Sequence, residues 1–171
     1  MNDVALTPQV TKELFIKMVV DAWNHSTNQV TKLFDELSDE QILAEAAPGR
    51  NTGIYLLGHL TAVTDRMLPL LELGERSYPQ LDKPFLATPD KSGLDVPSVQ
   101  ELKQYWKDVN AKLSAAIATV TPDDWFAKHT SVSAEDFAKE PHRNKLNVLI
   151  SRTTHLSYHW GQLILLKAKG D

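Results

Sequence analysis

Two histidines four residues apart, His155 and His159, form the pair in this sequence that is best spaced for metal chemistry. Residues separated by four positions lie on the same face of an α-helix, so the two imidazoles can converge on one ion. Helical metalloproteases combine such a pair with a glutamate directly after the first histidine, a position that Leu156 occupies here. The pair by itself therefore permits two interpretations: a metal-binding pair, or two partly exposed histidines that are hydrogen-bonded.

A third histidine, His59, lies three residues after Leu56 and four before Val63, in an apolar pattern that predicts burial on a helix. A histidine in this position is either hydrogen-bonded to a carbonyl in the core or a metal ligand. Side chains from facing helices build metal sites inside helical bundles. Together with His155 and His159, His59 would supply three nitrogen ligands and leave the ion open to water or substrate.

Other polar residues are weaker candidates for the same site. His25 lies in the first helical pattern and points either toward the interior near the metal or to the helix surface. Gln162 shares a helical face with His159, where it would hydrogen-bond a bound water or substrate, or make a polar contact in the core. His129 and His142 lie in irregular segments, so we expect them to be solvated.

The chain contains no cysteine, which excludes a disulfide scaffold, a thiolate nucleophile and a sulfur-ligated metal. A zinc or nickel site would therefore consist of imidazole and carboxylate groups. No Asp or Glu stands next to the histidine pair, and Asp65, six residues after His59, is turned away from the face of that histidine. The sequence therefore identifies no general base, and the catalytic residues are unknown from the sequence alone.

Apolar residues at helical spacing predict four long helices. The first two run over about 8–37 and 51–74, the second of them with Asn51 as its N-cap. The third and fourth run over about 98–120 and 144–170. The alternation that is typical of strands is nowhere sustained.

Shorter features connect and delimit these helices. Capping boxes at Ser38 and Ser98 predict helix starts, and Gly170 is expected at the end of the last helix. Residues 75–96 are rich in Pro, Gly, Asp, Lys and Ser and predict a long crossover loop, while 127–143 predicts an irregular segment. We therefore expect an all-α fold, a four-helix bundle with long crossover connections, in one domain that comprises all 171 residues.

The composition argues against nucleic acids and membranes as partners. The 18 Lys and Arg are scattered among 22 Asp and Glu, and the net charge is -4, whereas nucleic-acid-binding proteins carry a clustered basic face. No stretch approaches the roughly 20 apolar residues that cross a bilayer. The first six residues, Met1 to Leu6, are acidic and lack the apolar segment of a signal peptide, so we expect a cytoplasmic protein.

The segments that carry the three histidines resemble the DinB-like family of damage-inducible proteins. The resemblance rests on residues 51–66, with Gly58-His59-Leu60 at their centre, and on the pattern His155-x-x-x-His159-Trp160-Gly161-Gln162-Leu163. It implies a four-helix bundle with crossed connectivity, a homodimer, and one divalent ion, commonly nickel or zinc, on His59, His155 and His159. Many members have a tryptophan several residues before the first histidine, and this chain has Tyr55 nearby instead.

Three neutral ligands and this resemblance favour a metal-dependent enzyme, either a hydrolase or a transferase that uses an external thiol. Its partners would be a small-molecule substrate or a thiol. A non-catalytic metal-binding or stress-response module is the main alternative, and a metal-free helical interaction protein is the third. The helices carry more apolar surface than four stripes facing one core would need, and this surface includes Trp23, Leu68 and Leu71. The additional apolar surface would suit the interface of a homodimer.

Overall fold

The structure is a computed structural model that describes residues 7–169. Within this range it contains helices and two isolated β-bridges but no strand, so the predicted all-α class is confirmed. None of the helices in the described part of the chain combines the length and hydropathy that a membrane span requires. The α-helices are α1 (Pro8–Glu36), α2 (Asp39–Leu43), α3 (Gly53–Leu70), α4 (Val99–Ile117), α5 (Pro122–Trp125), α6 (Ala134–Lys139) and α7 (Lys145–Leu163).

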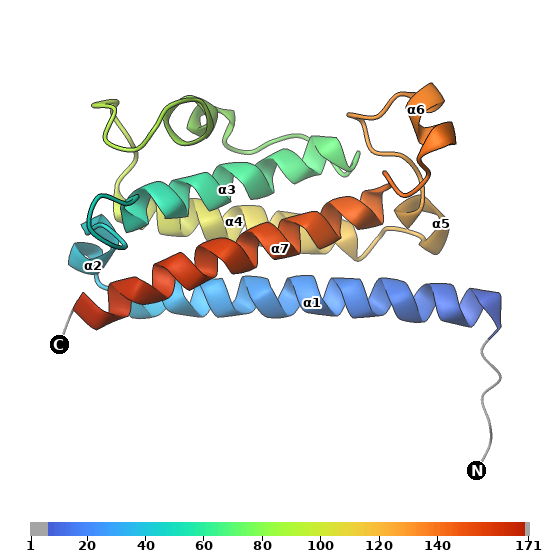
Figure 1. Cartoon of the computed structure of the whole chain (residues 1–171), viewed down its shortest axis with the longest axis horizontal. Coiled ribbons are helices and arrows are strands. Elements are labelled where there is room, and N and C mark those ends of the chain that lie inside the picture. Colours follow the sequence, from blue (N-terminus) through green and yellow to red (C-terminus); the bar gives the residue numbers. More distant parts are fainter. Residues whose placement is uncertain (1–6, 170–171) are drawn as a thin grey trace, which may run out of the picture.

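Four long helices, α1, α3, α4 and α7, make up the body of the molecule (Figure 1). The most extensive contacts join α3 to α4 and α1 to α7, and smaller contacts join α1 to α4 and α3 to α7. Figure 1 also shows that α1 and α7 run in one direction and α3 and α4 in the other. Since α3 and α4 are parallel neighbours, the chain must return along the molecule between them, which explains the long connection there.

Side-chain caps set the helix starts. Both predicted capping boxes, at Ser38 and Ser98, are formed. The N-cap of α3 is Thr52, whose hydroxyl accepts a hydrogen bond from the Tyr55 N–H. The assignment of this cap to Asn51 is therefore wrong by one residue, because the hydroxyl one position later reaches the free N–H.

The connections contain more helix than the sequence predicts. In the predicted loop 75–96, proline-initiated turns form a 3₁₀ helix, η1 (Pro79–Leu81), and a π-helical turn, η2 (Lys83–Ala87). In the irregular segment 127–143, Ser133 caps the short helix α6. The last helix is α-helical to Leu163 and continues as a 3₁₀ helix, η3 (Ile164–Lys169), while its predicted end at Gly170 lies outside the described residues.

The core lies between the four long helices. Phe34 of α1 and Trp106 of α4 are both fully buried and meet edge to face, with ring centroids 5.8 Å apart. Trp23, Leu68 and Leu71 are also core residues, each at most 3% exposed. These three side chains therefore offer no surface to a second copy, and the prediction of a homodimer loses the residues on which it was based.

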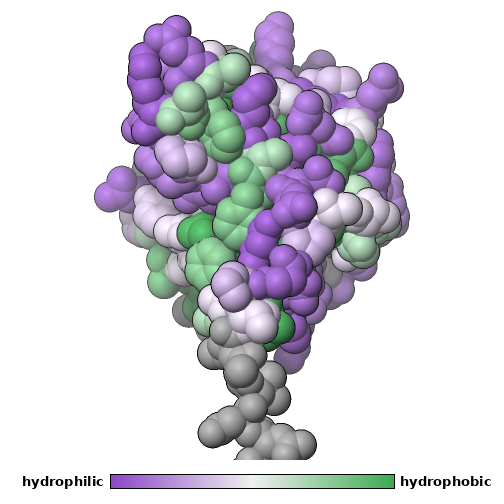
Figure 2. Space-filling view, turned by 90° about the vertical axis from the view of Figure 1, so that its right-hand side faces the viewer, coloured by the Kyte–Doolittle hydropathy of each residue, from purple (hydrophilic) through white to green (hydrophobic). Residues whose placement is uncertain are grey.

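The apolar surface that is exposed belongs to other residues. Figure 2 shows the end of the molecule at which α1 begins, and a band of hydrophobic residues crosses this end among hydrophilic ones. On the first half of α1, four large apolar side chains are 37–61% exposed: Val10, Leu14, Phe15 and Met18. Any assembly through apolar contacts would have this half of α1 available.

Candidate metal centre

The antiparallel pair α3 and α7 brings the three predicted histidines together. On α3, His59 stands between the buried residues Leu56 and Leu60, and its own side chain is half-buried. On α7, His155 is half-buried and His159 is 9% exposed. The apolar stripe that docks each helix therefore carries the imidazoles to the same place in the structure.

The Nε2 atoms of the three rings converge. Nε2 of His155 lies 3.2 Å from Nε2 of His59 and 3.1 Å from Nε2 of His159. All three candidate ligand atoms lie within 4.8 Å of one another. Nitrogens bound to one zinc ion at about 2.0–2.1 Å in a tetrahedral site are separated by about 3.3–3.4 Å. The two shortest separations between the nitrogens thus fit the coordination of a single ion.

Hydrogen bonds on the opposite side of two rings fix their tautomers. Nδ1 of His59 is 3.0 Å from the carbonyl oxygen of Phe85, and Nδ1 of His159 is 3.0 Å from Oε1 of Gln162. Because both partners are acceptors, each Nδ1 carries the hydrogen and donates it. The lone pair of each ring is then on Nε2, the atom that faces the other histidines.

All three histidines are shifted toward the neutral form. Burial, the neighbouring His159 and His59, and the charge of Arg152 lower the pKa of His155 to about 4. Burial is also the main reason why the pKa of His59 and the pKa of His159 are lowered, although the hydrogen bonds to Phe85 and Gln162 act in the opposite direction. Three neutral imidazoles are the form that binds a metal ion.

Two tyrosines border the cluster. The ring of Tyr55 stacks on that of His59 at 6.3 Å with an interplanar angle of 13°, and its hydroxyl donates to the Thr88 carbonyl at 3.0 Å. The ring of Tyr158 meets His159 edge to face at 5.0 Å. Tyr55 therefore provides an aromatic wall for the first histidine.

A cavity of about 500 Å³ lies beside Gln162, the residue that holds His159. Its lining is mixed, since it includes the polar residues Arg50, Asn51 and Tyr158 as well as the apolar Leu165. Gln162 thus stands between the histidine cluster and a space that is large enough for a small molecule.

A family model described as the DinB superfamily matches residues 22–163. The chain belongs to the DinB superfamily. No curated protein matches it. In this DinB-superfamily protein all three clustered histidines fall within the matched residues, and the family resemblance seen in the sequence is confirmed.

The remaining histidines lie outside the cluster. His25 is exposed on α1, so of its two predicted positions the structure shows the surface one. His142 is exposed, as predicted. His129 is partly buried, and its Nδ1 atom has no hydrogen-bond partner among the described residues, so the prediction that it is solvated is wrong.

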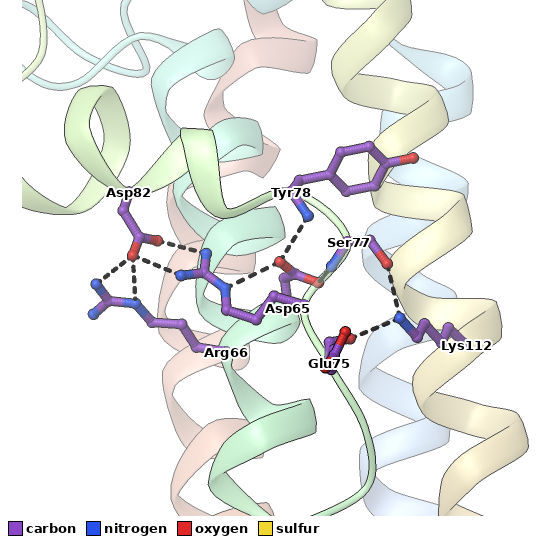
Figure 3. Close-up of polar contacts among 8 residues, drawn as sticks. Asp65, Arg66, Glu75, Ser77, Tyr78, Asp82 and Lys112 are labelled. Atoms are coloured by element: carbon purple, nitrogen blue, oxygen red, sulfur yellow. Dashed lines mark hydrogen bonds and ion pairs between the residues drawn. The ribbon is translucent and has the colours of Figure 1, made fainter.

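One acidic residue of α3 has a role that the sequence did not indicate. Asp65 is fully buried and accepts hydrogen bonds from the N–H groups of Ser77 and Tyr78 at 2.8 and 3.0 Å, and from Arg76 at 3.2 Å (Figure 3). Arg76 also binds Asp82 through two nitrogens. This network holds the segment after α3 against the helix, and that segment leads on to Phe85, the hydrogen-bond partner of His59.

Two further residues of the centre escaped the sequence-based prediction. The Phe85 carbonyl is a backbone acceptor, and no residue type marks it in the sequence. Arg152 precedes His155 by three positions, so helical spacing does place it on the same face. Its charge contributes to lowering the pKa of both His59 and His155.

Proposed function

We propose that this protein binds one divalent metal ion, nickel or zinc, on His59, His155 and His159, and that the site is open and catalytic. The observation that carries the proposal is the convergence of three Nε2 atoms from two helices. The reaction is either a hydrolysis or the transfer of a group to an external thiol.

The donor set fits such an ion in its chemistry as well as its spacing. Imidazole nitrogen suits zinc and nickel, and the lowered pKa values keep the rings neutral. Acceptors on the far side of His59 and His159 are the partners that metal-binding histidines require for a fixed orientation. Both features belong to the residues of this chain and are present before an ion binds.

Three ligands are one fewer than a closed structural zinc site contains. Within residues 7–169, no carboxylate joins the three histidines to complete the shell. A bound divalent ion would supply Lewis acidity that activates water or an external thiol. The protein would contribute binding and orientation, because it has no cysteine of its own to act as the thiol.

A non-catalytic metal-binding module is the second candidate. It is favoured by the same observation that no Asp or Glu of the described residues belongs to the cluster, since a hydrolase commonly uses a carboxylate as general base. In that case the ion would be held without turnover, and the protein would act by binding.

Metal content and calorimetry test the site. Protein purified without a histidine tag should contain about one nickel or zinc ion per chain, and His59→Ala, His155→Ala and His159→Ala should each weaken binding by more than the 10- to 100-fold typical of outer partners. His142→Ala is the matched control, because this histidine is exposed and outside the cluster. Equal affinity in the wild type and the three cluster variants would disprove the assignment.

Spectroscopy separates the two candidate functions. With cobalt in the site, azide or a thiol should change the visible spectrum if coordination positions are open. If neither azide nor the thiol changes the spectrum, and removal of the metal unfolds the protein, the site is closed and structural. This result would exclude the catalytic proposal.

A further inference from the structure

Arg152 is a half-buried arginine for which the described part of the chain provides no partner. Among the five arginines, Arg66, Arg76 and Arg143 each form an ion pair with a carboxylate. Arg152 has no ion pair and no hydrogen bond within the described residues, although it lies partly inside the protein on α7. Burying a cationic group without an anion is unfavourable, so the side chain is placed at a cost that a ligand would offset.

The position of Arg152 relates it directly to the histidine cluster. It lies one turn before His155, about 4.5 Å along the axis of α7. Arg152 is also seven residues before His159, and Arg66 is seven residues after His59 on the antiparallel helix α3. The two arginines therefore follow the same contact between α3 and α7, Arg66 about two helical turns beyond His59 and Arg152 about one turn before His155.

The two arginines at this contact differ in how their charges are compensated. Burial and the charge of Arg66 lower the pKa of the Arg152 guanidinium. Asp82 offsets the charge of Arg66 through two hydrogen bonds of 3.2 and 2.7 Å. No carboxylate of the described residues does the same for Arg152, so positive potential remains beside the cluster.

The geometry points to Arg152 as the residue that binds the oxyanion group, a carboxylate or a phosphate, of a small molecule whose other end reaches the three histidines. The planar guanidinium presents a fork of N–H donors that matches either group with two parallel hydrogen bonds. This inference rests on the proposed function for the metal end of the ligand. The binding of the anionic end of the ligand is inferred from Arg152 alone.

Matched pairs of thiols test the inference in the cobalt-substituted protein. 3-Mercaptopropionate is compared with 3-mercapto-1-propanol, and 6-mercaptohexanoate with 6-mercapto-1-hexanol, by titration of the visible spectrum. In at least one pair the acid should bind about tenfold or more tightly than the alcohol, as expected for a charge-assisted hydrogen bond. Arg152→Gln should abolish this preference, and Arg152→Lys should retain part of it. An unchanged preference in Arg152→Gln would overturn the inference.

A second arginine serves as the matched control. Arg50 lines the cavity beside Gln162 and, like Arg152, has no carboxylate partner among the described residues. Arg50→Gln should keep the preference for the acid. Loss of the preference in Arg50→Gln but not in Arg152→Gln would place the anion in that cavity and refute the role of Arg152.

A metal-free arm separates this inference from the proposed function. If no thiol changes the cobalt spectrum, the open metal site is wrong, and Arg152 is tested alone by the thermal unfolding of metal-free protein in phosphate or acetate. One of these anions should raise Tm in the wild type more than in Arg152→Gln, and the effective one identifies the anion. Arg152→Gln loses no ion pair, so its Tm without anion should not fall. Equal stabilisation of both proteins would overturn the inference.

Discussion

Oε1 of Gln162 lies 3.0 Å from Nδ1 of His159, one turn earlier on α7, and accepts its hydrogen. An acceptor in this position orients the imidazole and makes its Nε2 a better ligand. We predict that Gln162→Ala lowers zinc affinity about 10- to 100-fold while thermal unfolding of the metal-free protein changes little. Calorimetry measures this, with Gln104→Ala on the exposed surface of α4 as the control. Equal zinc affinity in both variants would show that Gln162 does not support the ligand.

Gly58 should tolerate no side chain. It is buried on α3 beside His59, and a Cβ there would overlap the ring of Phe85. Gly58→Ala should destabilise the protein by about 1–3 kcal/mol, because the ring cannot move without disturbing the buried turn that also supplies the acceptor for His59. Urea denaturation measures the change.

Gly161 on α7 is the matched control for this substitution, since a Cβ there meets nothing within 4 Å. Gly161→Ala should be neutral or stabilise by about 0.5–1 kcal/mol, the usual gain from alanine in a helix. If the two substitutions had the same effect, the close approach of Phe85 would not be the cause.

Asp65→Asn should destabilise the protein by about 2–3 kcal/mol. The substitution keeps the shape but removes the charge that pairs with Arg76, and its NH2 group replaces an acceptor that faces N–H donors. Glu135→Gln breaks an exposed i,i+4 pair with Lys139 and should cost less than about 1 kcal/mol. Chemical denaturation of both variants checks the difference, and a cost for Asp65→Asn as small as that of Glu135→Gln would contradict it.

The metal-free protein should lose stability as the pH falls from about 6.5 to about 4. The pKa of His155 is about 4 in the folded protein against an ordinary value of 6.5, and the pKa values of His59 and His159 are also lowered. Between these values the unfolded chain binds more protons than the folded one, so acid favours unfolding.

Replacement of His155 tests this dependence on pH. His155→Gln should make the decline shallower over this window, whereas His142→Gln, at an exposed position, should follow the wild type. The measurement is the free energy of unfolding in urea at several pH values. A slope that is unchanged in His155→Gln would show that the buried imidazoles do not cause it.

A homodimer remains a prediction, and the exposed apolar side chains of the first half of α1 are its most suitable interface. Leu14, Phe15 and Met18 are 48%, 47% and 61% exposed. A stable interface buries about 1,200–2,000 Å² in total, so a dimer through this face should persist at low micromolar concentration in light scattering. Leu14→Glu with Met18→Glu should then give a monomer. A monomer mass for the wild type at all concentrations would exclude the dimer.

The sequence by itself determined the four long helices and the three histidines that converge in the structure. Helical periodicity and the capping residues Ser38 and Ser98 act over one or two turns, so they can be recognised without knowing the fold. The spacing of His155 and His159 is equally local, and the apolar pattern around His59 correctly indicated a side chain that faces another helix. The cap at Thr52 was missed by one residue, since adjacent Asn and Thr are both good caps.

Only the tertiary structure decided how these parts are supported. The antiparallel contact of α3 and α7 sets the distance between His59 and His155, and no sequence spacing encodes it. The acceptor for His59 is the backbone oxygen of Phe85. Phe85 lies in the helical turn η2, within a segment that the sequence predicts as a loop. Asp65 and Arg152 look alike in the sequence, as charged residues near histidines. Folding buries Asp65 among donors and leaves Arg152 half-buried with no anion from residues 7–169, because long-range packing rather than residue type determines which charges are paired.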